Sequence, residues 1–331
     1  MKIRITRLNI TRSNMKRVTL FLFVICGSIF LLSFSGKNSE AHKAQIKTII
    51  IDPGHGGIDP GARGDYSTEA QVSLAVALKF GKALQEEFPD LKIVYTRTTD
   101  VMAGNKRSKD EGLKYRANLA NESNGDLFIA IHCNSAPDIR HKTRIGTKTV
   151  SYYAGKGKKR KKVYKKVPQY RYWTTPNPAH GTETYIWAVS KNDAKVSAVN
   201  KTPDTEEYGE IDSTLNIELP DPSDPAEKAR MLIYAQNYFK KSLSLADLVE
   251  KEFIASGRFS RGVKQRNHAG IWVLQATGMP SILVEIGFIS QEDDEKYINS
   301  EEGQQEIVED LVSAFKAYKQ KTESRTITTT P

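Results

Sequence analysis

Two histidines in this sequence occupy positions typical of a functional site, and the first is His55. It lies in residues 49–57, Ile-Ile-Ile-Asp-Pro-Gly-His-Gly-Gly, a pattern that predicts a strand buried on both faces and ended abruptly by a turn. The glycines around the imidazole allow a tight turn and the close approach of a ligand. A histidine in a glycine turn can also be a plain turn residue, so this stretch alone leaves both interpretations open.

The same arrangement recurs at two further strand ends. Residues 127–131 form an apolar run followed by His132, and residues 282–284 form another followed by Glu285. Ligands of parallel α/β sheets bind beyond the carboxyl ends of the strands, so these side chains are expected at one edge of a sheet. A glutamate after an apolar run is costly to bury unless it serves a metal, a proton or a partner charge; for Glu285 a salt-bridged structural role is the alternative.

Glu69 adds a second carboxylate to this group. Thr68 and Gln71 fit a capping box, which places Glu69 in the first turn of a helix. Two imidazoles and one carboxylate can hold a zinc ion while a fourth position stays open for water, and another carboxylate can move protons. The residues therefore suit a hydrolytic zinc site.

The elements that position these residues alternate between strand-like and helix-like segments. This alternation predicts an α/β fold with a mainly parallel sheet and helices on its faces. The expected strands are residues 46–52, 92–96, 127–131, 181–187, 271–274 and 281–286, and the expected helices are 68–88, 108–122, 224–255 with a break near Ser242, and 304–318.

Two long segments interrupt the pattern. Residues 138–179 contain thirteen Lys or Arg, from Arg140 to Arg171, and no Asp or Glu between those two positions. Such a run cannot offset its ordering entropy by apolar burial, so we expect an exposed, mobile insert. It either binds an anionic partner or has no dedicated partner. Residues 190–225 are expected to form a polar loop, and 321–331 a polar tail.

The N-terminal residues 1–41 have the composition of a signal peptide or membrane anchor. Six basic residues precede an apolar run at residues 18–34, and either Met1 or Met15 fits as the initiator. Cleavage beside Ser35 or Ala41 and retention as an anchor both remain open. The protein is thus expected to be exported, to the periplasm or cell envelope. The formal net charge of +10 comes from this leader and the basic insert, which argues against a general nucleic-acid binder.

Several longer motifs, in register from about residue 46 to 320, carry a resemblance to a known family. They are Asp52-Pro-Gly-His-Gly-Gly-Ile-Asp-Pro-Gly-Ala62, Glu69, Arg116-Ala-Asn118, Ile131-His-Cys-Asn-Ser-Ala136, Gly181-Thr-Glu-Thr-Tyr185, Arg261-Gly-Val-Lys264 and Leu283-Val-Glu-Ile-Gly-Phe-Ile-Ser290. Together they resemble the zinc-dependent N-acetylmuramoyl-L-alanine amidases of the third amidase family, which are cell-wall hydrolases. The resemblance implies a single α/β domain with a twisted, mostly parallel β-sheet flanked by helices, spanning residues 46–320.

The resemblance also implies the site and the reaction. His55, Glu69 and His132 would bind one Zn²⁺, and Glu285 would be the catalytic general base and acid. Water activated by zinc would attack the amide between N-acetylmuramic acid and L-alanine in peptidoglycan, releasing stem peptides. The alternatives are a catalytically silent, regulatory wall-binding relative and a zinc peptidase of different specificity.

Three features depart from the family pattern. Cys133 follows His132 where a small residue is commoner; adjacent strand residues point to opposite faces, so we expect Cys133 to pack in the core. His268 lies in a slightly longer segment, as a site contact or an exposed loop residue. The basic insert is the third departure. Expected partners are peptidoglycan, an anionic partner or membrane surface through the insert, and a protein activator; no nucleic acid is expected. Glu206, Glu207, Glu210 and Glu218 are candidates for carboxylates that cover the metal.

Overall fold

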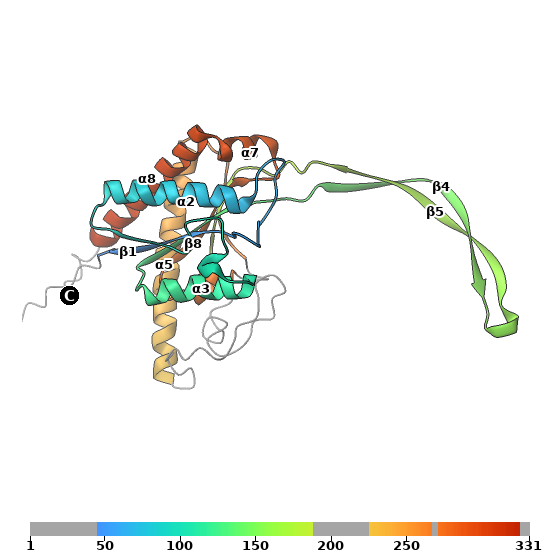
Figure 1. Cartoon of the computed structure of the whole chain (residues 1–331), viewed down its shortest axis with the longest axis horizontal. Helices are drawn as coiled ribbons and strands as arrows, with labels where there is room; N and C mark the ends of the chain where they lie inside the picture. Colours follow the sequence, from blue (N-terminus) through green and yellow to red (C-terminus); the bar gives the residue numbers. More distant parts are fainter. Residues whose placement is uncertain (1–44, 188–224, 267–270, 325–331) are drawn as a thin grey trace, which may run out of the picture. The chain divides into compact units, whose positions relative to one another are not determined.

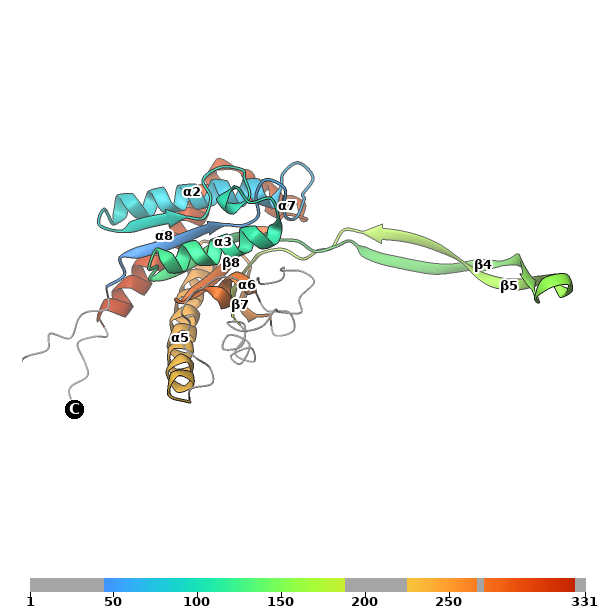
Figure 2. The same cartoon turned by 60° about the horizontal axis from the view of Figure 1, so that its bottom comes forward.

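The computed structural model describes residues 45–187, 225–266 and 271–324 (Figures 1 and 2). One compact unit spans Gln45–Glu323. No helix among the described residues is long and apolar enough to cross a membrane. The expected leader at residues 1–41, residues 325–331 of the expected tail, most of the polar loop and His268 lie outside the described residues. Residues 321–324, expected to begin the polar tail, instead belong to the last helix, Glu301–Ser324.

A six-stranded mixed sheet forms the centre of the unit. Its strand order is β2 (Lys92–Tyr95), β1 (Thr48–Pro53), β3 (Leu127–Asn134), β8 (Ser281–Phe288), β6 (Thr182–Ile186) and β7 (Ser260–Gln265). All neighbouring pairs are parallel except β6 and β8, which are antiparallel. The expected α/β class with a mostly parallel sheet is confirmed.

Helices cover both faces of the sheet (Figure 1). They are α2 (Glu69–Glu87), α3 (Lys109–Glu122), α5 (Pro225–Ala255), α6 (Trp272–Ala276), α7 (Glu292–Asn299) and α8 (Glu301–Ser324), with a 3₁₀ turn η1 (Ala103–Asn105) before α3. Strand β1 shows why two layers form. Ile49 and Ile51 face a core with α2, α5 and α8, whereas Ile50 faces a second core with α3 and α6. Burial on both faces explains the unbroken apolar runs of the central strands.

Two of the expected elements differ in the structure. Residues 271–274, expected as a strand, belong mainly to the short helix α6, because a brief apolar run does not distinguish a strand from a buried helical turn. Helix α5 continues through Ser242 without the expected break. The buried Ser242 hydroxyl accepts a hydrogen bond from the Ser281 N–H at 2.9 Å, which ties α5 to the start of β8.

The basic insert has regular structure that its composition did not predict. Strands β4 (Ile139–Ala154) and β5 (Lys161–Thr175) pair antiparallel around a 3₁₀ turn, η2 (Gly157–Lys159) (Figure 2). The expected exposure is confirmed, since most side chains of both strands are open to solvent. The ladder of backbone hydrogen bonds and the many Thr, Val and Tyr residues, which favour extended backbone, account for the pairing.

Candidate metal centre and its supporting residues

Strand register brings the predicted site residues to one edge of the sheet. Pro53 of β1 lies opposite Ile131 of β3, so the residues that follow, His55 and His132, leave the sheet at the same edge. His132 in turn lies directly opposite Glu285 of β8. Opposed residues on neighbouring strands point to the same face, which places the Glu285 side chain beside that of His132.

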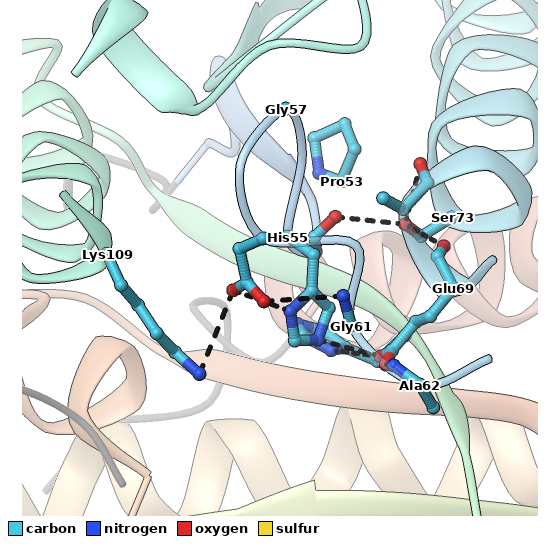
Figure 3. A network of polar contacts seen from close by, with 12 residues as sticks. Pro53, His55, Gly57, Gly61, Ala62, Glu69, Ser73 and Lys109 are labelled. Atoms are coloured by element: carbon cyan, nitrogen blue, oxygen red, sulfur yellow. Dashed lines mark hydrogen bonds and ion pairs between the residues drawn. The ribbon is translucent and has the colours of Figure 1, made fainter. Parts of the chain in front are cut away.

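His55, Glu69 and His132 converge on one point. Their potential ligand atoms all lie within 4.8 Å of one another. Glu69 Oε1 is 3.1 Å from His55 Nε2 and 2.7 Å from His132 Nδ1, and the two imidazole rings meet edge to face. Figure 3 shows the side chains of His55 and Glu69 directed at each other. Two imidazoles and a carboxylate are the donor set of a hydrolytic zinc site, so these residues fit the ion.

The protonation states of the three groups depend on one another. Burial alone would lower the pKa of His55, but its hydrogen bonds to Asp59 and Glu69 outweigh burial and raise it to about 9. Burial lowers the pKa of His132. For Glu69, hydrogen bonds with both histidines outweigh burial and hold its pKa well below the usual range. The carboxylate is therefore ionised at neutral pH, and His55 carries a proton that a metal ion would displace.

Asp59 fixes the orientation of His55. Its Oδ2 lies 2.8 Å from His55 Nδ1, which leaves Nε2 directed at Glu69. Lys109 of α3 approaches the same Asp59 oxygen at 3.8 Å (Figure 3). A carboxylate on the far nitrogen of a ligating histidine sets its tautomer and raises its basicity, so Asp59 suits the role of an outer partner to a metal ligand.

The backbone packs closely around the ligand group. The Ala62 N–H donates to Glu69 Oε2 at 2.9 Å, and the Cys133 N–H donates to Oε1 at 3.2 Å. A Cβ at Gly61 would lie 2.6 Å from Glu69 Oε2, and one at Gly54 would lie 2.5 Å from the His132 ring. These two positions accept only glycine without a shift of the ligands.

A buried pair of arginines supports the turn that carries His55. Arg116 pairs with Asp52 and donates to the carbonyls of Pro53 and His55. Arg97 donates to the carbonyls of Pro53, Gly54 and Ala70, at 3.0, 2.6 and 2.7 Å. Carbonyls of a glycine turn would otherwise be buried without partners, which is costly. The arginines therefore hold the turn that presents the imidazole.

Glu285 is buried beside this centre and lacks a full set of partners. Its Oε2 has no hydrogen-bond donor among the described residues. Burial, together with the negative charges of Glu69 and Glu183, raises its pKa well above the usual range. A bound cation would lower that pKa again. A buried carboxyl with a raised pKa beside a candidate metal centre is suited to proton transfer.

Glu183 of β6 lies opposite Glu285 on its other side and forms a separate network. It accepts hydrogen bonds from Arg261 Nε at 2.8 Å, from the Tyr185 hydroxyl at 2.7 Å, and from Lys264 and Asn134. Burial would raise the pKa of Glu183, but the bonds from Lys264, Tyr185 and Arg261 outweigh it and lower the pKa. Glu183 is thus a paired carboxylate, in contrast to Glu285.

The structure brings together all four residues singled out in the sequence: His55, Glu69, His132 and Glu285. Cys133 is buried in the core that contains Val72 and Val284, as expected, and points away from the site. His268 and the four glutamates proposed to cover the metal lie outside the described residues. Sequence reasoning gave no role to Asp59, Arg97 or Glu183, and the motifs that contain Asp59 and Glu183 were the available signal.

Comparison with known proteins relates the chain to N-acetylmuramoyl-L-alanine amidases. The family model described as N-acetylmuramoyl-L-alanine amidase matches residues 49–317. The germination-specific N-acetylmuramoyl-L-alanine amidase of Bacillus subtilis is 33% identical over 148 residues, which cover 41% of this chain and 60% of that protein. The N-acetylmuramoyl-L-alanine amidase AmiC of Escherichia coli is 24% identical over 275 residues, 82% of this chain and 52% of that protein. The chain thus spans little more than half the length of these relatives.

A solved structure agrees with the fold. The CwlD amidase from Clostridioides difficile, determined in complex with the GerS lipoprotein, superposes with a TM-score of 0.50 at 20% identity, covering 82% of this chain and 98% of that one.

Proposed function

The chain belongs to the N-acetylmuramoyl-L-alanine amidase family, and from this membership we propose that it hydrolyses the amide between N-acetylmuramic acid and L-alanine in peptidoglycan, releasing stem peptides. One observation carries the proposal: two imidazoles and a carboxylate converge beside Glu285, a buried glutamate without a full set of partners. This combination supplies both parts of amide hydrolysis, a place for a Lewis acid and a group for proton transfer.

We propose His55, Glu69 and His132 as the ligands of one zinc ion. A bound zinc ion lowers the pKa of water toward about 7 and polarises a carbonyl. The protein's own residues prepare the site for it. Asp59 holds the Nδ1 proton of His55, so the proton that a metal ion would displace is the one on Nε2. Burial keeps His132 neutral, and a protonated imidazole nitrogen cannot ligate.

Glu285 is proposed as the group that moves the proton. As a carboxylate it takes a proton from the attacking water, and as a carboxylic acid it gives that proton to the departing amino group of L-alanine. The electron pair of the broken C–N bond stays on nitrogen, and the lactyl carboxylate is the second product. Burial beside Glu69 and Glu183 favours the protonated form that this second step needs.

We also propose export to the periplasm or cell envelope, supported by the basic and apolar leader at residues 1–41 and by a relative named as a cell wall amidase. Cleavage of that leader and retention as an anchor remain alternatives. Control by a protein activator is a further proposal, supported by the structural neighbour that was determined with a lipoprotein.

The test is a digestion of isolated peptidoglycan by the purified protein with zinc, with new termini identified by mass spectrometry. Free L-alanine amino termini on released stem peptides are expected, and a zinc chelator should remove the activity. New termini inside the stem peptides would instead identify a peptidase. Absence of any cleavage, with zinc bound one to one, would favour a silent wall-binding relative or a protein that needs an activator.

A further inference from the structure

The β4–β5 ribbon carries charge and aromatic groups in an ordered pattern. All thirteen of its Lys and Arg residues lie in a segment without a single Asp or Glu. Eight of the twelve large apolar or aromatic side chains that are exposed in the described part of the chain also belong to it. Strand preference alone accounts for tyrosines in a ladder, but soluble surfaces expose large apolar side chains singly, so this concentration of exposed rings in one segment indicates a binding surface.

Strand register sorts these side chains onto two faces. In an antiparallel ladder, opposed residues share a face and successive residues alternate between faces. The tyrosine face consists of Tyr153, Tyr164, Tyr170 and Tyr172 with Arg140, Lys142, Arg144, Lys162 and Lys166. The tryptophan face consists of Tyr152 and Trp173 with Lys148, Lys161, Lys165 and Arg171. Both faces therefore carry cations and rings together.

Contacts within the faces show lysines beside tyrosine rings on one face and a stack of two rings on the other. On the tyrosine face, Lys142 Nζ lies 5.8 Å from the Tyr170 ring centroid and Lys162 Nζ lies 5.7 Å from that of Tyr164. On the tryptophan face, Trp173 stacks on His141 with 5.2 Å between the ring centroids. Each lysine–tyrosine pair can accept a flat apolar ring and a negative charge at the same time, and the His141–Trp173 stack offers an aromatic surface.

The two ends of the ribbon are fixed at the edge that carries the candidate metal centre. Strand β4 begins shortly after His132 of β3, and β5 leads into β6, which carries Glu183. β3 and β6 flank β8, the strand of Glu285, and β6 runs antiparallel to β8. The Asn177 side chain joins the two ends by donating to the Pro137 carbonyl at 3.1 Å. A polymer bound by the ribbon is therefore held near this edge of the sheet, which we call the site edge.

We propose that the β4–β5 ribbon binds the peptidoglycan wall, with its cations on stem-peptide carboxylates and its aromatic rings against the sugar rings of glycan strands. This inference rests on the proposed function, which makes the wall the substrate. A flat lipid surface would contact one face only, whereas both faces carry rings and cations, which favours a meshwork that surrounds the ribbon. The ribbon raises the local concentration of substrate amides at the site without touching the reacting atoms.

Binding is measured by cosedimentation with purified peptidoglycan sacculi, using Glu285→Gln as the background so that the wall is not cut. The ribbon variant changes Lys142, Lys148, Lys162 and Lys166 to Gln. The matched control changes four exposed lysines elsewhere, Lys82, Lys92, Lys240 and Lys251, to Gln. We expect the ribbon variant to bind about 10- to 100-fold more weakly at low salt. The control should stay within about twofold of its parent.

Two further arms identify the groups that are bound. The double variant Tyr164→Ser with Tyr172→Ser should bind sacculi more weakly even at high salt. In the second arm, the carboxyl groups of the sacculi are amidated. The parent protein should bind these sacculi as weakly as the ribbon variant binds intact sacculi. Equal binding by ribbon variant and control would overturn the proposal. Tighter binding to phosphatidylglycerol vesicles or to a DNA duplex than to sacculi would do the same.

Turnover of a soluble muramoyl peptide, measured with Glu285 intact, separates this proposal from the amidase proposal. The ribbon variant should cleave the soluble substrate at the parental rate and sacculi more slowly. Failure of every variant to cleave the soluble substrate would count against the amidase activity alone, because binding to sacculi does not depend on cleavage.

Discussion

The site edge and the β4–β5 ribbon are both polar, yet they are built in opposite ways. At the site edge, buried charges such as Asp52 and Arg116 pair across long stretches of chain. In the ribbon, cations stand in solvent on a local ladder and have no acidic partner within it. The buried, paired charges at the site edge fix the positions of the backbone and side chains around them, so removing one disturbs the fold. The exposed cations of the ribbon are available to a binding partner, so removing one changes binding.

The largest difference should appear in stability. Arg116→Met leaves Asp52 buried without its cation, and we expect the free energy of unfolding to fall by about 3–5 kcal/mol. Lys166→Met on the ribbon should change it by no more than about 0.5 kcal/mol. Urea unfolding of both variants makes the measurement. Similar values for the two would remove the distinction between the regions.

The outer partner of His55 should matter next. Asp59→Asn keeps the size of the side chain but removes its charge, and zinc affinity should fall about 10- to 100-fold. Lys109→Gln, which removes the cation 3.8 Å from Asp59, should have a much smaller effect. Competition with a chromophoric chelator measures both affinities. Unchanged affinity in Asp59→Asn would contradict the role given to this carboxylate.

Zinc affinity should also rise with pH. Without metal the pKa of His55 is raised to about 9, so at lower pH its proton competes with zinc. The apparent affinity should therefore rise about tenfold per pH unit between pH 7 and 9 and then level off. Titration calorimetry at pH 7 in buffers of different ionisation enthalpy should detect the released proton. Binding without proton release would show that His55 is not a ligand.

Two glycines give the finest comparison. Gly61 at the site and Gly157 in the ribbon turn have similar positive φ values, 66° and 56°. Alanine at either position meets about 1–2 kcal/mol of backbone strain. Only at Gly61 does the new Cβ meet Glu69 and His55; at Gly157 nothing lies within 4 Å. Gly61→Ala should therefore lose zinc affinity, whereas Gly157→Ala should keep it at the parental value. Equal affinities would mean that Gly61 does not shape the site.

Sequence alone could predict the parts of the molecule where residue type is restricted by chemistry or by burial. The apolar runs of β1, β3 and β8 predicted their strands, and the residues that end them predicted the edge where His55, His132 and Glu285 meet. Strand β7 was not predicted, because Ser-Arg-Gly-Val-Lys-Gln shows no clear apolar alternation. The pairing of Asp52 with Arg116 depends on tertiary packing across 64 positions, which no local pattern records.

The ribbon was missed for another reason. Its many lysines correctly predicted that the segment is exposed. The prediction gave too little weight to the Thr, Val and Tyr residues between the lysines, which favour strands. The composition of the segment therefore predicts its exposure to solvent. Its strands are predicted only by the order of the residues along it.

The division of roles at the site edge is tested most directly by measuring bound zinc and amide cleavage in the same preparations of Glu285→Gln and Glu69→Ala. We predict that Glu285→Gln keeps one zinc ion per chain while cleavage of peptidoglycan falls about 10²- to 10⁴-fold. Glu69→Ala should lose the zinc and the activity together. Loss of zinc from Glu285→Gln, or cleavage by it at the parental rate, would contradict the account.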